Sequence, residues 1–234
     1  MKKVKVIAFD ADDTLWHTEN HFQDVQRKFA GILEKFAPPD EVYARLNETE
    51  LRNLPLFGYG VKGFTLSMVE TAIDISDLNI TASDIHHIVM LGKSIFDAPL
   101  ELMDGVEEVL ATLSSDFRLF LITKGDVLDQ RNKIEKSGLE RYFERTEVVQ
   151  KKDPATYARL FARYDIAVEN VAMIGNSLRS DILPILELNG AVVYIPYHVT
   201  AHFEKVANRV DSPRFHEIEC IADLPDLIRS GTSN

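Results

Sequence analysis

Three carboxylates follow the first apolar run of the chain. Residues 4–9 (VKVIAF) read as a buried strand, and Asp10-Ala11-Asp12-Asp13-Thr14 comes directly after it. Because residues two apart on an extended segment share a side, Asp10 and Asp12 can face one cavity. One carboxylate could attack while the other handles the proton, and carboxylate oxygens suit Mg²⁺. The alternative is a solvated acidic turn or a helix N-cap.

A hydroxyl and a glycine end a second apolar run. The sequence there is Ile122-Thr123-Lys124-Gly125. A hydroxyl beside free backbone amides at a strand-to-helix turn can hold a phosphate group, so Thr123, Lys124 and Gly125 are candidate phosphate ligands. A plain turn capped by threonine explains the same residues about equally well.

Two further polar clusters lie near strand ends. Lys151 and Lys152 precede Pro154, which suits the first turn of a helix, and either lysine could neutralise a carboxylate or a phosphate. The segment Gly175–Asp181 follows another apolar run and offers Asp181 as an oxygen ligand. Each of these clusters alone is better explained as a solvated loop or a helix cap.

These clusters are positioned by alternating elements. Strand-like runs are expected at residues 4–9, 117–122, 171–174, 191–195 and 216–221. Helical patterns at residues 106–113, 154–164 and 182–188 precede the three middle runs. This alternation predicts an α/β fold, with a Rossmann-like parallel sheet covered by helices on both faces. All strands then end at one edge, where ligands bind, so the four clusters should meet.

Residues 16–97 differ from the rest of the chain. They show helical periodicity, as in Val25, Phe29 and Leu33, and lack strand-like runs. We therefore expect an inserted α-helical domain at residues 16–97 and an α/β core formed by residues 1–15 and 98–234.

The composition and net charge of the chain limit its expected partners and location. The 234 residues carry a net charge of −11, which disfavours nucleic acid and anionic membranes as partners. No apolar stretch is long enough for a membrane span, and the first residues do not resemble a secretion signal, so a cytoplasmic location is expected. The single cysteine, Cys220, is interpreted as a small apolar residue in a strand.

Taken together, the four clusters resemble the motifs of the haloacid dehalogenase-like (HAD) hydrolase superfamily. Asp10-Ala11-Asp12-Asp13-Thr14 resembles its D-x-D-x-T signature, which is specific in this setting. Thr123, the lysine pair and Gly175–Asp181 resemble the second, third and fourth motifs, which are weak singly and strong together. Residues 16–97 resemble the family's helical cap. The resemblance extends over nearly the whole chain.

The resemblance implies a phosphatase mechanism. Asp10 would attack phosphorus and form an aspartyl-phosphate, and Asp12 would act as general acid and base. Thr123 would bind the phosphoryl group beside Lys152 or Lys151, of which Lys152 is preferred. Mg²⁺ would be held by Asp10, the backbone carbonyl of Asp12, and Asp181.

Two positions refine the substrate class and the metal ligands that the resemblance implies. The dehalogenases of the superfamily lack an acid at the position of Asp12, so its presence favours phosphate esters. The fourth motif commonly has an acidic residue after glycine, where this chain has Asn176. An amide oxygen can still serve a metal-bound water, and Asn176 is therefore a candidate ligand that brings no charge.

Several other residues have weaker functional interpretations. Trp16 and His17 are equally consistent with substrate contact and with a hinge. The pairs His86-His87 and His198/His202 lack further ligands at metal-binding spacing, so solvated helix faces are favoured.

The expected activity is Mg²⁺-dependent hydrolysis of a small phosphomonoester, by a monomer or homodimer. The alternatives are a phosphotransferase or phosphomutase acting on a sugar phosphate, a non-catalytic binding protein on the same fold, and a phospho-acceptor signalling domain. The sequence does not identify the substrate.

Overall fold

The computed structural model describes residues 4–206 and 210–232. The chain forms two compact units. One is an α/β unit made of the residues up to His17, Leu100–Lys124 and the residues from Gln130 onward. The other is a helical unit made of Thr18–Pro99 with Gly125–Asp129. The inserted unit thus begins and ends two residues later than the sequence suggests.

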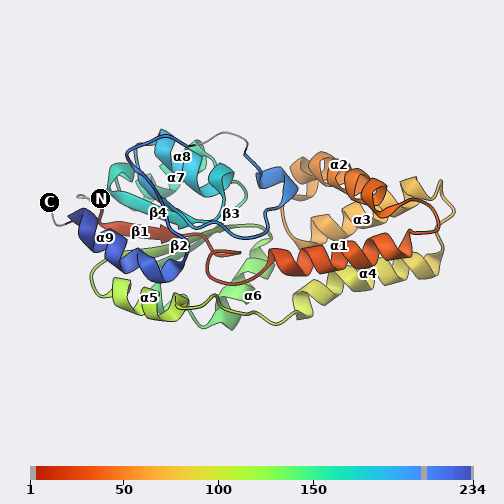
Figure 1. Ribbon diagram of the computed structural model, residues 1–234, viewed down its shortest axis with the longest axis horizontal. Helices are drawn as coiled ribbons and strands as arrows, with labels where there is room; N and C mark the ends of the chain where they lie inside the picture. Colours follow the sequence, from red (N-terminus) through yellow and green to blue (C-terminus); the bar gives the residue numbers. More distant parts are fainter. Residues whose placement is uncertain (1–3, 207–209, 233–234) are drawn as a thin grey trace. The chain divides into compact units, whose positions relative to one another are not determined.

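The α/β unit is built on a six-stranded parallel sheet of order β3-β2-β1-β4-β5-β6 (Figure 1). The strands are β1 (Val6–Phe9), β2 (Arg118–Lys124), β3 (Arg145–Val149), β4 (Val171–Gly175), β5 (Ala191–Tyr194) and β6 (Phe215–Glu217). This confirms the predicted fold class. Because β1 lies between β2 and β4, the loops after these three strands are neighbours at one sheet edge.

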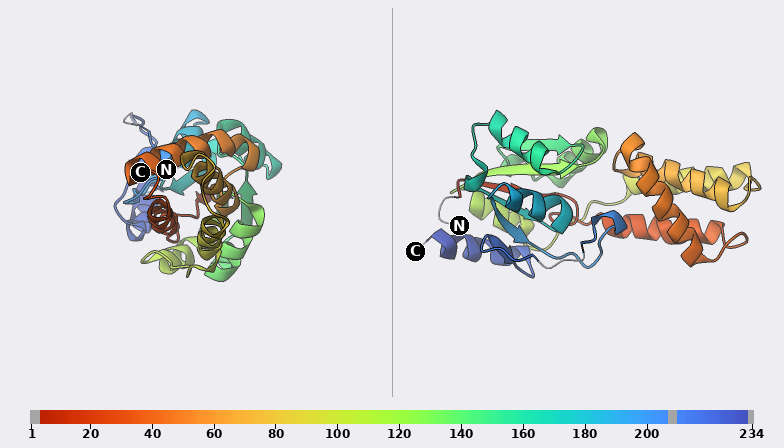
Figure 2. Two further views of the ribbon diagram at one scale, coloured as in Figure 1. Left: turned by 90° about the vertical axis from the view of Figure 1, so that its right-hand side faces the viewer. Right: turned by 90° about the horizontal axis from the view of Figure 1, so that it is seen from above.

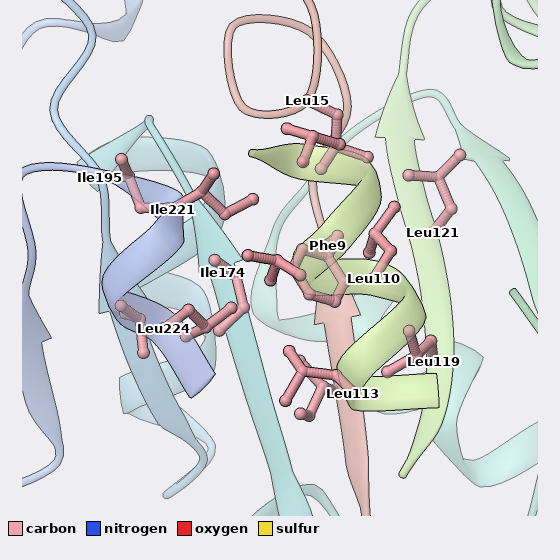
Figure 3. Packing of buried hydrophobic residues seen from close by; sticks show 14 of the residues in the cluster. Phe9, Leu15, Leu110, Leu113, Leu119, Leu121, Ile174, Ile195, Ile221 and Leu224 are labelled. Carbon is pink, nitrogen blue, oxygen red and sulfur yellow. The ribbon is translucent and has the colours of Figure 1, made fainter. Parts of the chain in front are cut away.

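Both faces of the sheet are covered by helices. Alternate residues of the central strands pack on opposite sides, so Phe9, Leu121 and Ile174 belong to one core, shown in Figure 3. That core is closed by α5 (Val106–Ser114) and α9 (Leu224–Thr232). On the other face, α7 (Pro154–Arg163) and α8 (Leu183–Glu187) cover the second core.

The sheet differs from expectation at its edges. The edge strand β3 was not among the predicted strands. Its sequence is not a uniform apolar run, because Arg145 is exposed and the other four residues are half-buried. The last strand ends at Glu217, so Cys220 lies outside it, is exposed, and caps a short 3₁₀ helix; its assignment to a strand was wrong.

The helical unit consists of four helices, drawn from two further sides in Figure 2. They are α1 (Glu19–Ile32), α2 (Pro39–Phe57), α3 (Val61–Ile75) and α4 (Ala82–Asp97). Apolar residues such as Phe29, Leu46 and Met68 form its separate core. Thr81 caps α4 by accepting from the Asp84 amide at 3.1 Å.

Polar side chains lie between α2 and α3 as well. Asn53 Nδ2 donates to Ser67 Oγ at 3.1 Å and to Glu70 Oε2 at 2.8 Å. Glu50 lies about one turn earlier in α2, and one of its carboxyl oxygens is buried without a hydrogen-bond partner among the described residues. Burial raises the pKa of Glu50 to about 7.

We expect Glu50→Gln to stabilise the protein more at high pH than at low pH. Glu50 has a pKa of about 7 in the folded protein and 4.5 as an ordinary glutamate, so stability falls as pH rises through this interval. Glutamine removes that loss, about 2 kcal/mol after allowing for partial exposure. Urea unfolding below pH 4.5 and above pH 7 measures it. The exposed Glu48→Gln is the control, and equal pH dependence in Glu50→Gln and wild type would contradict this account.

Within the described residues, none of the helices is both long enough and apolar enough to cross a membrane.

Candidate active site

Asp10 occupies the end of the central strand. Its amide donates to the Ile174 carbonyl of β4 at 2.9 Å, which continues the sheet pairing and fixes the backbone. The side chain is buried, one oxygen accepts from Thr14 Oγ1 at 3.1 Å, and the other pairs with Lys152 Nζ. Asp10 is thus a fixed carboxylate whose ammonium partner comes from a distant loop.

Lys152 joins two buried carboxylates. Its Nζ also contacts Asp181 Oδ1 at 2.7 Å, and the Lys152 and Asp181 side chains are each 1% exposed. Burial disfavours the charge of Lys152, but Asp10 and Asp181 outweigh it and hold its pKa well above the ordinary value. Burial, aided by the charge of Asp10, raises the pKa of Asp181 despite Lys152. Two carboxylates therefore share one cation.

Of the two candidate lysines, only Lys152 reaches this cluster. Lys151 is exposed, so the structure corrects its inclusion among the site residues. The direction of Lys152 is set by the start of α7, where Asp153 accepts from the Thr156 amide at 2.8 Å and Pro154 takes the first turn.

The turn after β4 holds Asp181. The Ser177 amide donates to Asp181 Oδ2 at 3.0 Å, and the Asp181 amide donates to the Ser177 carbonyl at 2.9 Å. A Cβ at Gly175 would lie 2.4 Å from Asp181 Oδ2, so only glycine fits there. Asn176 Oδ1 lies 3.3 Å from Thr14 Oγ1, which places this amide beside the first motif.

Asp12 has its own set of partners. Lys133 Nζ lies 2.8 and 2.9 Å from its two oxygens, and Gln130 Nε2 and Trp16 Nε1 each donate at 2.8 Å. Burial alone would raise the pKa of Asp12, but the charge of Lys133 and these hydrogen bonds lower it. Trp16 is fully buried in the α/β unit, where its indole N–H donates to Asp12.

Sequence reasoning missed Gln130 and Lys133. Both lie on α6 (Val127–Ser137), a mostly polar helix. Their spacing of three residues places them on one helix face, and this was the only available signal.

The second motif is placed only in part as expected. Thr123 is buried at the end of β2. The Lys124 side chain turns to Ser180 and Glu204. Gly125 has a φ of 141°, which favours glycine, and clusters with the helical unit.

The donor set fits a hard cation. Asp10 and Asp181 supply buried carboxylates with one negative charge left uncompensated by Lys152, and Asn176 adds a neutral oxygen. Within the described ranges, no three His, Cys, Asp or Glu side chains gather as a metal cluster. Mg²⁺ needs no such all-protein cage, because it usually retains several waters.

Two of the histidine candidates contact Tyr197. His17 Nδ1 lies 2.7 Å from Tyr197 Oη, and His198 packs against the Tyr197 ring.

Comparison with known proteins identifies the family. Residues 4–188 match the family model of haloacid dehalogenase-like hydrolases. A haloacid dehalogenase-like family hydrolase from Xanthomonas campestris is 40% identical and superposes with a TM-score of 0.88, covering 97% of this chain and 91% of that chain. The chain belongs to the HAD-like hydrolase family. The predicted resemblance is confirmed, and the protein is a hydrolase.

More distant HAD-fold structures share the architecture alone. Magnesium-bound YfnB from Bacillus subtilis is 17% identical with a TM-score of 0.67, covering 97% of this chain and 99% of that one. A 2-haloacid dehalogenase from Pseudomonas syringae is 20% identical with a TM-score of 0.65 and the same coverage. No curated protein matches the sequence.

Proposed function

We propose that this hydrolase is a Mg²⁺-dependent phosphatase acting on a small phosphomonoester. The observation that carries the proposal is the pair of separately held carboxylates at one strand end. Asp10 is paired with Lys152, whereas Asp12 is held by Lys133 and Gln130. A nucleophile and a proton carrier need this separation of environments.

Each residue then has one role. Asp10 attacks phosphorus, and its carboxylate becomes an aspartyl-phosphate. Asp12 gives a proton to the leaving oxygen and later takes one from the attacking water. Thr123 donates its hydroxyl to the phosphoryl oxygens, and Lys152 compensates their charge.

In this proposal, Mg²⁺ would neutralise the negative charge of Asp10 and Asp181 that Lys152 leaves uncompensated. Asp10, Asp181 and the Asp12 carbonyl would hold it, with Asn176 contributing directly or through water. Bound Mg²⁺ supplies charge neutralisation for the phosphoryl group. The magnesium-bound structure of YfnB supports this assignment by analogy of fold.

We further propose that the helical unit acts as a cap that selects small substrates. The chain leaves the α/β unit after His17 and returns at Leu100. These connections run side by side, since the His17 amide donates to the Glu101 carbonyl at 3.0 Å. The first connection starts a few residues after Asp12 and the second pairs with it, which suits a unit that controls access to the site.

Phosphate release from p-nitrophenyl phosphate and a panel of small phosphate esters tests the proposed activity. We expect turnover with Mg²⁺ and loss of turnover with EDTA. Transfer between two positions of a sugar phosphate without phosphate release would indicate a phosphomutase. Turnover on none of the esters, with folded protein and saturating Mg²⁺, would contradict the phosphatase proposal.

Lys133→Met should weaken proton transfer by Asp12. Lys133 lowers the pKa of Asp12 but also holds both of its oxygens in place, so we expect the loss of this orientation to reduce kcat about 10- to 100-fold. The loss should be larger for an alkyl phosphate than for p-nitrophenyl phosphate, because the alkoxide leaving group depends more on protonation. Lys136→Met, on an exposed part of the same helix, is the control. Equal losses on both substrates would argue against the role given to Asp12.

A further inference from the structure

The segment after β5 contacts several of the polar loops at the sheet edge. It comprises residues 196–204 and lies beyond residue 188, where the family match ends. Three side-chain contacts anchor it: Tyr197 Oη to His17 Nδ1 at 2.7 Å, Arg179 Nη1 to the Phe203 carbonyl at 2.7 Å, and Glu204 to Lys124. The segment therefore follows the edge that carries the candidate active site.

Glu204 connects this segment to the loops after β2 and β4. One carboxyl oxygen accepts from Lys124 Nζ, and the other accepts from Ser177 Oγ and from Ser180 Oγ, the latter at 2.7 Å. Lys124 Nζ also donates to Ser180 Oγ at 2.7 Å, and Ser177 Oγ accepts from the Ser180 amide at 3.0 Å. Every hydroxyl thus donates once and accepts once, which makes the network internally consistent.

The network is mostly shielded from water. The Lys124 and Glu204 side chains are 17% and 10% exposed. Burial would raise the pKa of Glu204, but the charge of Lys124 and the three donors hold it below the ordinary value. Glu204 is therefore an ionised acceptor, and such charge-assisted hydrogen bonds are stronger than neutral ones.

The serines connect this network to the proposed metal ligand. Ser177 binds the Asp181 carboxylate through its amide, and Ser180 is the residue before Asp181. A shift of either hydroxyl would move the Ser177–Asp181 turn. Because Lys124 ends β2, Glu204 ties this turn to the strand that carries Thr123.

We propose that Glu204 is a positioning residue that fixes Asp181 by holding Ser177 and Ser180 against Lys124. Its functional part rests on the proposed phosphatase activity. The Lys124 ammonium is engaged in this structural role, so its side chain is assigned to the network and not to phosphate binding.

Two measurements on full-length Glu204→Gln and Glu204→Ala test the proposal. The first is amide hydrogen exchange of the peptide covering residues 176–182, which requires no activity. We expect exchange to be about 10-fold faster in both variants because the side-chain support of the turn is weakened. The second is the Mg²⁺ concentration that gives half-maximal phosphatase activity, which should rise about 10- to 100-fold while KM for the ester changes little.

The exposed residue Glu219, changed to glutamine, is the matched control and should alter neither measurement. Unchanged exchange in both Glu204 variants would overturn the positioning role whether or not the wild-type protein is a phosphatase. Faster exchange with unchanged Mg²⁺ dependence would overturn its connection to Asp181. If the wild type hydrolyses none of the esters while exchange still accelerates, the phosphatase proposal fails and the positioning of the turn stands.

Discussion

Asp10→Asn will keep the fold and lose turnover by about 10⁴-fold or more, since an amide cannot replace the carboxylate as nucleophile. Asparagine preserves the shape of the side chain and can still accept from Thr14, and Lys152 keeps Asp181 as a partner. The loss should therefore appear in kcat. Single-turnover and steady-state phosphate release measure it, with circular dichroism to verify folding.

Asp226→Asn, at a carboxylate that is 94% exposed, is the control for this substitution. Asp10→Ala excludes slow conversion of asparagine back to aspartate as a source of residual activity. Turnover within about 10-fold of wild type in both Asp10 variants would show that another group attacks the substrate.

Lys152→Met will have the second-largest effect, on both activity and stability. The substitution leaves Asp10 and Asp181 buried together without their shared cation, and breaking a buried pair in this way costs about 3–5 kcal/mol. We expect kcat to fall about 10³-fold, because the charge beside the phosphoryl group is also lost. Urea unfolding and phosphate release measure the two effects.

Lys151→Met provides the matched control one residue away, on an exposed side chain. It should change the free energy of unfolding by less than about 0.5 kcal/mol. Added Mg²⁺ should restore part of the stability of Lys152→Met, because a cation would again compensate the two carboxylates. Equal effects of the two substitutions would contradict the geometry assigned to Lys152.

Much of the α/β unit follows from sequence patterns. The central strands are uniform apolar runs because helices cover both of their faces, and Asp10, Thr123 and Asp181 come at or just beyond their ends. The edge strand β3 was not predicted, since half-buried positions carry no consistent pattern. Topology then brings the loops of β1, β2 and β4 together.

Local patterns could not predict the supporting residues. Lys133 reaches Asp12 across 121 positions of sequence, and Glu204 reaches Lys124 across 80. Such contacts arise from the packing of distant elements, and a lysine on a polar helix or a glutamate in a loop looks like any solvated side chain. The choice between Lys151 and Lys152 likewise depended on the orientation of one turn before α7.

In the proposed mechanism, Asp10 carries the phosphoryl group during turnover. The most direct test of this step is an acid quench of the enzyme during hydrolysis, followed by mass spectrometry of the peptide that contains Asp10. With p-nitrophenyl phosphate, whose leaving group depends less on protonation, Asp12→Asn should increase the trapped fraction, because it removes the base that activates water. We predict one phosphoryl group on Asp10 in the quenched enzyme. Hydrolysis with a phosphoryl group on another residue, or with none in either protein, would contradict the mechanism.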